Sequence, residues 1–326
     1  MEILEAYCFE LDRVVDIYDA QDAFFALPES RRKRFKFGCS DEACRTAKNP
    51  LVSGVNYDKL SEETEKYRQL HFRAPAGHPH LDTCIWVQGH AERYSKDRDA
   101  HINHDARIER AKSTNVIDIF NPRAFDTLAD TRAGNPSASK LGVRHNSLTS
   151  TDTSSGSVHT RDGYSTTSRL ERFIDCWAQF DGEDLKRHQV AINGRTLSYR
   201  QAVLRPNWIT PEEIGGRIAY GGARIKFWPD DKPSRIYINF MDECEKLPEH
   251  GGGRSLTIDL PLSRIRDYRG GALLLRRIEQ AQKPGHYLKV YCWGSIKPRD
   301  QRSGYIIEIA SLDNLVVKAI GKGIGS

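Results

Sequence analysis

The sequence lacks the features that define several large classes of protein. No run approaches the 18 apolar residues of a membrane span, and no apolar stretch with a positive flank lies near Met1, so we expect neither a membrane anchor nor a secretory signal. Cysteines number seven, an odd count without regular pairing, which favours a reducing, cytoplasmic location. The motifs GxxxxGK[ST], HExxH and GxSxG are absent, so no common nucleotide-binding or hydrolytic site is indicated.

Charge is only mildly unbalanced over the whole chain, at a net +5, which does not by itself indicate a nucleic-acid partner. Its distribution is more informative. Residues 201–326 hold 20 Lys and Arg against 14 Asp and Glu, a net of +6. A second concentration is the run RRKRFK at residues 31–36. This run fits either the solvated end of a helix or a strand with a basic outer face.

The order of segments predicts an α+β chain with two folded parts. Residues 1–125 are interpreted as a small zinc-binding module with flanking helices, one of them over residues 16–27. In residues 147–168, 13 of 22 are Ser or Thr, and such a segment buries too little apolar surface to offset its ordering entropy. We therefore expect a disordered linker over residues 126–168. Residues 169–326 are expected to open with a helix over 169–186 and to continue as a mainly β domain.

A metal site is the strongest chemical signal in the sequence. Three of the seven cysteines and three of the eleven histidines fall between Phe37 and Trp86. Zinc in structural sites takes four Cys or His ligands in a tetrahedron, which such a cluster can supply. The predicted ligands are Cys39, Cys44 and Cys84 with one histidine, for which His71 is favoured over His80, and His78 stays open. The alternatives are buried structural cysteines and a Cys39–Cys44 disulfide.

The same region resembles the N-terminal part of competence protein CoiA-like chains. The resemblance rests on a strand pair around residues 4–20 and a following helix, then Phe37 and Cys39, Cys44, His71-Phe72, and His80 to Cys84. It covers residues 1 to about 90, and it departs from the family pattern at Ala74, where that family often has a second histidine. The resemblance implies a zinc-binding module associated with DNA handling, and it carries over no catalytic activity.

Alternating residues divide the C-terminal strands into two faces, because side chains point to opposite sides with a period of two. The expected strands are 223–228, 234–240, 254–261, 286–294, 304–309 and 312–320, interrupted by a helix at 272–282, and a hairpin turn is expected at Asn193-Gly194. One face of three of these strands is aliphatic. The other mixes aromatic rings with cations: Arg224, Lys226, Trp228, Arg235, Tyr237, Tyr287, Lys289, Tyr291 and Trp293.

Rings and cations on one sheet face are what single-stranded nucleic-acid binding requires, and a five-stranded OB-like barrel would present them. The alternative is that these rings form a second core against the 169–186 helix. We therefore predict a non-enzymatic, zinc-containing, single-strand-binding protein. A DNA nuclease or a nuclease-associated component of a competence or mobile-element system is the second hypothesis. Its only motif is Asp184-Leu185-Lys186, preceded by Asp181. A protein–protein adaptor is the third.

Overall fold

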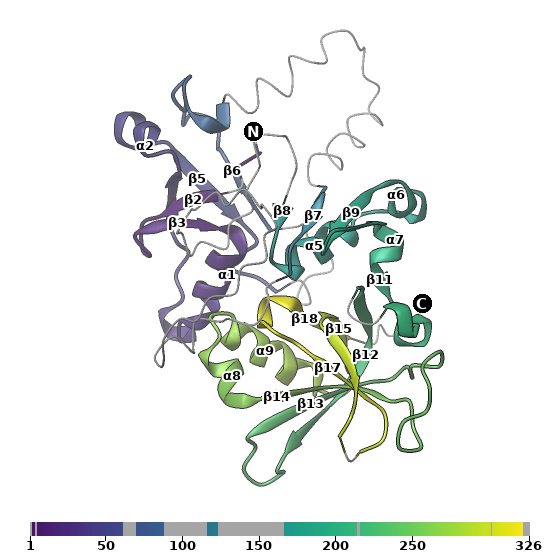
Figure 1. Ribbon diagram of the computed structural model, residues 1–326. Helices are drawn as coiled ribbons and strands as arrows, with labels where there is room; N and C mark the ends of the chain where they lie inside the picture. Colours follow the sequence, from purple (N-terminus) through teal and green to yellow (C-terminus); the bar gives the residue numbers. More distant parts are fainter. Residues whose placement is uncertain are drawn as a thin grey trace, which may run out of the picture.

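The computed structural model describes residues 2–3, 5–60, 70–87, 116–122, 166–213, 216–300 and 302–321. Within them the chain forms three open sheets with helices packed against them (Figure 1), in agreement with a mixed helix-and-sheet class. Most of the expected linker, residues 126–165, lies outside the described residues. Its last residues do not continue a linker, since Thr166–Thr167 form strand β8. None of the described helices has the length and apolarity needed to cross a bilayer.

The N-terminal sheet contains six strands in the order β1-β6-β5-β4-β2-β3. The buried rings Phe37 and Phe72 of this sheet, Tyr57 after β5 and Phe24 of α1 form a chain of edge-to-face contacts with centroids 4.9–5.7 Å apart. The strands and helices are β1 Glu2–Ile3, β2 Glu5–Cys8, β3 Arg13–Asp16, α1 Ile17–Ala26, η1 Glu29–Arg31, β4 Phe37–Cys39, α2 Glu42–Lys48, β5 Leu51–Val55 and β6 His71–Arg73.

The helix predicted over residues 16–27 is α1. The carboxylate of Asp16 accepts a hydrogen bond from the backbone N–H of Asp19 at 2.7 Å, which caps the helix N-terminus. Pro28, which cannot continue the backbone hydrogen bonding, follows the C-cap residue Leu27. The predicted boundaries are therefore confirmed to within a residue, because both ends are fixed by local chemistry.

A second, four-stranded sheet has the order β10-β9-β7-β8. The hairpin predicted at Asn193-Gly194 is confirmed, and both residues have positive φ angles of 49° and 76°. The single helix expected over residues 169–186 is wrong: Asp181 accepts from the backbone N–H groups of Glu183 and Asp184, and so begins a new helix. The elements are β7 Ile119–Phe120, α5 Leu170–Trp177, α6 Gly182–Arg187, β9 Gln189–Ile192, β10 Arg195–Ser198 and α7 Tyr199–Ala202.

The C-terminal sheet contains eight strands, seven in the order β16-β17-β14-β13-β12-β15-β18, with β11 paired to β12. The expected OB-like barrel is not formed, because β16 and β18 end the sheet without pairing to each other. The elements are β11 Val203–Leu204, η4 Pro206–Trp208, η5 Pro211–Glu213, β12 Ile218–Trp228, β13 Arg235–Phe240, β14 Leu256–Pro261, α8 Leu262–Asp267, α9 Gly271–Ala281, β15 His286–Trp293, β16 Ser295–Pro298, β17 Tyr305–Glu308, η6 Leu312–Asn314 and β18 Leu315–Gly321.

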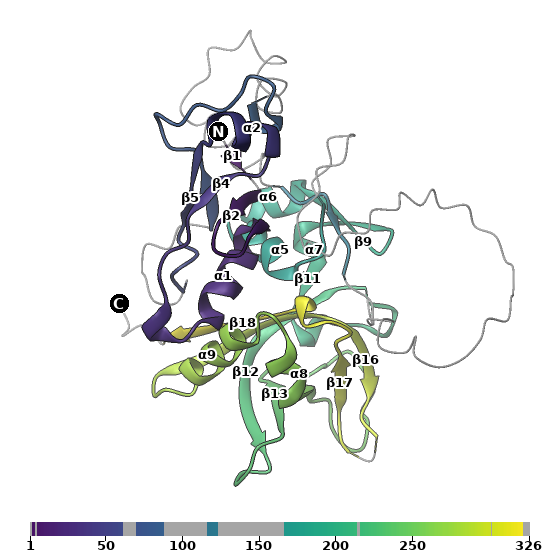
Figure 2. The same cartoon turned by 90° about the vertical axis from the view of Figure 1, so that its left-hand side faces the viewer.

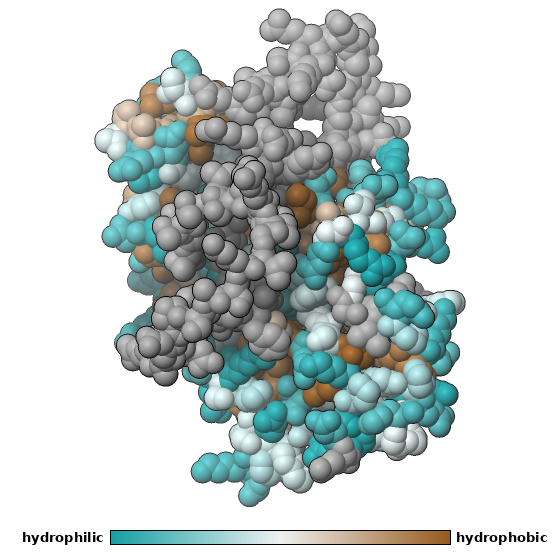
Figure 3. Space-filling model, in the orientation of Figure 1, coloured by the Kyte–Doolittle hydropathy of each residue, from teal (hydrophilic) through white to brown (hydrophobic). Residues whose placement is uncertain are grey.

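The two faces of this sheet follow the predicted alternation. The aliphatic face, with Ile236, Ile238 and Ile258, packs against α8 and α9 through Ile265 and Ile278, and Figure 2 shows these helices lying across the strands. On the opposite face, α5 covers the part formed by β15, β18 and the start of β12. Hydrophilic side chains prevail at the lower end of the molecule in Figure 3, where the β12–β13 hairpin projects in Figure 1.

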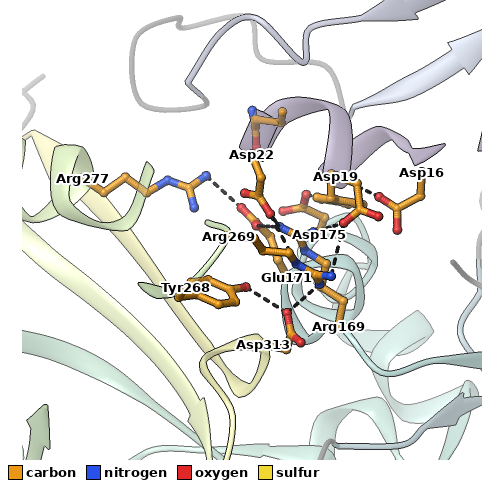
Figure 4. Close-up of polar contacts among 12 residues, drawn as sticks. Asp16, Asp19, Asp22, Arg169, Glu171, Asp175, Tyr268, Arg269, Arg277 and Asp313 are labelled. Carbon is orange, nitrogen blue, oxygen red and sulfur yellow. Dashed lines mark hydrogen bonds and ion pairs between the residues drawn. The ribbon is translucent and has the colours of Figure 1, made fainter. Parts of the chain in front are cut away.

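The three parts meet at a buried network of charged groups (Figure 4). The guanidinium of Arg169, whose side chain is 5% exposed, pairs with Asp19 at 3.2 Å and Asp22 at 2.6 Å of α1. Arg269 pairs with Asp313 at 2.8 Å. Helix α1 also packs against α9, whose Leu273 belongs to the N-terminal hydrophobic core. The N-terminal region and the C-terminal sheet are therefore joined by apolar packing and by ion pairs.

Candidate metal centre and basic sheet surface

Four predicted ligand residues lie together in the N-terminal region. Cys39 ends β4, Cys44 lies in the first turn of α2, and His80 and Cys84 come from the chain after β6. All four are buried, and one potential ligand atom from each lies within 4.8 Å of the others. The cysteines are free thiols, so the alternative of a Cys39–Cys44 disulfide does not hold. This arrangement can hold one metal ion.

Three of the distances within the cluster are close to the edges of a four-coordinate metal site. The sulfur atoms of Cys39 and Cys84 are 3.6 Å apart, and the Nδ1 atom of His80 lies 3.6 Å from the Cys44 sulfur and 3.4 Å from the Cys84 sulfur. Around a zinc ion with Zn–S of about 2.3 Å and Zn–N of about 2.0 Å, tetrahedral angles give S–S edges of about 3.8 Å and S–N edges of about 3.5 Å. The side chains are therefore arranged for coordination, with Nδ1 as the histidine ligand atom.

Asp41 connects the two halves of the cluster. Its carboxylate caps α2 by accepting from the backbone N–H of Cys44 at 3.0 Å, and it also accepts from the backbone N–H of Ile85 at 3.2 Å. The hydrogen bond from Cys44 lowers the pKa of Asp41. The backbone N–H of Leu81 donates to the Cys44 sulfur at 3.3 Å. We did not identify Asp41 from the sequence, although an Asp immediately before a helix is a recognisable N-cap signal.

Burial sets the protonation of the ligands in the absence of a cation. It raises the pKa of the Cys39 and Cys84 thiols and lowers the pKa of His80, so all three groups favour their neutral forms. A bound cation reverses this preference for the thiols, because metal coordination releases their protons. Three buried sulfurs and an imidazole form a donor set that suits zinc well and suits magnesium or calcium poorly.

The structure selects among the candidate histidines. His71, favoured from the sequence, lies in β6 and is the register partner of Val55. Its neighbour Phe72 points into the hydrophobic core, so His71 points to the other face of the strand, and it lies outside the ligand group. His78 lines a surface groove instead. His80 reaches the cluster because it lies in the same loop as Cys84, four residues before it. The spacing of the histidines in the sequence does not show which of them lies in that loop.

The predicted nucleic-acid residues divide into an open and a covered group. Arg224, Lys226 and Trp228 follow one another on the exposed face of β12, and Trp228 is 48% exposed. Arg235 and Tyr237 of β13 are half-buried and lie directly across from Trp228 and Lys226 in the register. We call these five residues the open sheet face. The Lys226 ammonium lies 5.8 Å from the Trp228 ring centroid, and Arg235 pairs with Asp259 at 2.8 Å.

The covered group belongs to a second core, as the alternative hypothesis stated. Tyr291 is 3% exposed and packs against Trp177 of α5, and Trp293 is part of the same cluster. Tyr287 and Lys289 are half-buried at the boundary of the open sheet face, and the Lys289 ammonium lies 5.6 Å from the Tyr291 ring centroid. Stacking of bases on Tyr291 is therefore excluded in this conformation, because α5 occupies its surroundings.

Two residues near the open sheet face were missed in the sequence. The Arg302 guanidinium lies 5.9 Å from the Tyr237 ring centroid. Tyr220 stacks on Tyr291 and accepts a hydrogen bond from Arg205 at 3.3 Å. Tyr220 continues the alternation of β12, which begins at Ile218 rather than at residue 223, but the pair Gly221-Gly222 concealed that continuation.

The nuclease motif does not occupy the position its chemistry needs. Asp184 and Lys186 lie on helix α6, with Asp181 as its cap, whereas a magnesium-binding nuclease core places such residues on adjacent strands. Lys186 pairs with Glu183 at 2.6 Å, and Arg187 lies 3.5 Å from Asp184. These contacts are ordinary helix-surface pairs.

Comparison with protein-family models, with curated proteins and with solved structures gave no match. The fold and the site therefore define the chain only as a mixed helix-and-sheet protein with a buried Cys3His group that can hold a metal ion.

Proposed function

We propose that this chain is a zinc-containing protein that binds single-stranded nucleic acid on the open sheet face. The zinc has a structural role: Cys39, Cys44, His80 and Cys84 supply all four ligands of a tetrahedral ion, which leaves no position for water or substrate. Such an ion closes residues 74–87, a segment of mostly small and polar side chains, onto the sheet and α2.

The observation that carries the binding proposal is the exposed row Arg224, Lys226 and Trp228 on β12. An aromatic ring stacks on a base, and neighbouring cations neutralise phosphates, without selecting one base over another. Tyr237 lies directly across from Lys226 and provides a second aromatic ring for the same nucleic-acid strand. The guanidinium of Arg302 lies over the Tyr237 ring. The open sheet face is accessible because α5 packs only against the start of β12, at Ile218 and Tyr220.

Substitution of Trp228 by Ala tests this proposal in the full chain. Loss of one stacked base costs about 1–3 kcal/mol, so the affinity for an unstructured oligothymidylate measured by fluorescence anisotropy should fall about 5- to 150-fold. Trp208→Ala is a matched control, because Trp208 is 56% exposed and has the Lys246 ammonium 4.3 Å from its ring centroid, but it lies in η4. Equal losses in both variants, or no binding by the unaltered protein, would contradict the proposal.

Salt dependence separates nucleic-acid binding from the adaptor hypothesis. Affinity for a single strand should decrease steeply with ionic strength because phosphate contacts release counterions, whereas an interface formed by aromatic residues should respond weakly. A flat salt profile would favour a protein partner.

A further inference from the structure

A groove runs along β5 on the surface of the N-terminal region, separate from both the metal ligands and the open sheet face. It has a volume of about 850 Å³. We call it the β5 groove; it is lined by Arg34, Phe35, Lys36, Phe37, Leu51, Val52, Ser53, Gly54, Val55, Asn56, Asp58, Lys59, Arg73, Pro75 and His78. Three of these residues, Arg34, Phe35 and Lys36, belong to the basic run RRKRFK.

The groove exists because two neighbouring chain segments stop pairing. Strand β4 pairs with β5 only at Phe37↔Val52 and Gly38↔Leu51. Beyond that point the guanidinium of Arg34, rather than a ladder hydrogen bond, donates to the carbonyl oxygen of Gly54 at 2.6 Å. The backbone N–H of Phe35 donates to the hydroxyl of Tyr57. Residues 34–36 therefore form one wall, held by side-chain contacts, and β5 with Arg73 of β6 forms the other.

The charge in the groove is mainly positive. Arg34, Lys36, Lys59 and Arg73 are exposed cations, and Asp58, 3.5 Å from Arg34, is the acidic residue among the lining residues. The aromatic lining residues, Phe35 and Phe37, are buried in the hydrophobic core and present no ring for stacking. The groove therefore offers the cations that a chain of phosphates needs, and its lining contains no exposed Phe, Tyr or Trp ring of the kind that anchors bases or dominates protein interfaces.

We propose that the β5 groove binds the phosphodiester backbone of the same nucleic acid whose bases stack on the open sheet face. This inference rests on the proposed function and divides it between two surfaces: the sheet face contacts bases and phosphates, and the groove contacts phosphates alone. Such contacts position a strand without reading its sequence. A nucleic-acid strand that contacts both surfaces at once binds more tightly than a strand that contacts only one, because the second contact forms intramolecularly.

The test is the salt dependence of oligothymidylate binding by the full chain, loaded with zinc. The groove variant combines Lys36→Gln, Lys59→Gln and Arg73→Gln, which are exposed positions and leave the Arg34 contacts in place. Each lost phosphate contact lowers the slope of log K against log salt by about 0.7 for a single strand, so the slope should fall by about 2. The matched control combines Arg13→Gln, Arg31→Gln and Lys33→Gln, exposed cations of the same region outside the groove, and its slope should not change.

The outcomes distinguish the two proposals. Binding by the unaltered protein with the same slope in the groove variant overturns the groove site and leaves the sheet face standing. A fall of the slope in the control variant as large as in the groove variant shows that only net charge matters, which also overturns the groove site. Competition by polyglutamate as strong as by the oligonucleotide would assign the groove to an acidic protein. No binding by the unaltered protein overturns both.

Discussion

The N-terminal region and the C-terminal sheet are stabilised in different ways. The C-terminal sheet buries a continuous aliphatic face between its strands and helices α8 and α9. In the N-terminal region, residues 74–87 contribute few side chains to the hydrophobic core, and the buried group at their end consists of Cys84 and His80 with Cys39 and Cys44. Residues 74–87 have too few apolar side chains to form a core of their own, and a metal ion held by the four buried ligands would fix this segment instead.

Electrostatics differ between these regions and the junction that joins them. At the junction, Arg169 is buried with the carboxylates of Asp19 and Asp22, and Lys318 is 2.8 Å from Asp175. By contrast, Arg224 and Lys226 of the open sheet face and the cations that line the β5 groove are exposed. Removal of one partner from a buried ion pair lowers the free energy of unfolding strongly. Removal of an exposed cation changes it little, and an exposed cation is accessible to a ligand.

The largest effect is expected from removal of a metal ligand. In Cys39→Ser or Cys84→Ser, or after chelation, β4, β5 and β6 should lose hydrogen-exchange protection while β12 to β15 keep theirs. A structural zinc contributes about 10–16 kcal/mol in small finger modules, more than a region of this size can lose and stay folded. Cys8→Ser is the control, because Cys8 is buried in β2 outside the ligand group. Unchanged hydrogen-exchange protection in β4 to β6 without metal would show that the N-terminal region, like the C-terminal sheet, does not depend on a metal ion for its stability.

A smaller effect is expected at the junction. Arg169→Met leaves the carboxylates of Asp19 and Asp22 buried with less compensation, and breaking a buried pair in this way costs about 3–5 kcal/mol. Urea unfolding of the zinc-loaded protein should measure this loss. Arg200→Met, at an exposed position, should change the free energy of unfolding by less than about 0.5 kcal/mol. Similar values for both variants would show that the junction does not stabilise the contact between the regions.

The junction should also make stability depend on pH. Burial raises the pKa of Asp16 from 3.8 to about 7, so the folded state holds a proton that the unfolded state releases between these values. Stability therefore falls as the pH rises from about 4 to 7, by at most about 1.4 kcal/mol per pH unit. Asp16→Asn keeps an N-cap oxygen and should remove this dependence, so its advantage over the unaltered protein should be larger at pH 8 than at pH 5. An equal difference at both pH values would exclude Asp16 as the cause.

The smallest effect is expected next to the metal centre. Asp41→Ala removes the acceptor shared by the backbone N–H groups of Cys44 and Ile85, while all four ligands remain. Partners of this kind typically change metal affinity 10- to 100-fold, and competition with a chromogenic chelator should measure the loss. Asp82→Ala, an exposed acidic residue between His80 and Cys84, is the control. Equal affinities in the two variants would show that Asp41 does not orient the ligands.

Local patterns in the sequence predicted much of the fold. The Asn193-Gly194 turn, helix α1 and the alternation of β12, β13 and β15 depend on neighbouring residues, and the structure shows each of them. Helix α8 and strand β16 were not predicted, and the barrel was wrong, because sheet closure depends on which distant strands pair. Likewise, alternation separated the two faces correctly, but it did not show that α5 covers Tyr291 and leaves Trp228 open.

The metal ligands show the same limit. The residue types pointed to Cys39, Cys44 and Cys84, which the structure places together. The choice between His71 and His80 depended on whether each lies in a strand or in a loop. His71 is fixed in β6 by its pairing with β5, and no spacing rule contains that information.

X-ray absorption at the zinc edge, with metal analysis of the purified protein, measures directly whether Cys39, Cys44, His80 and Cys84 hold zinc. We predict one zinc per chain with three sulfur neighbours at about 2.3 Å and one nitrogen at about 2.0 Å. His80→Ala should replace the nitrogen by water or reduce the zinc content, and His71→Ala should leave the spectrum unchanged. A ligand shell dominated by oxygen, or an N-terminal region that folds with no zinc bound, would contradict a structural zinc site.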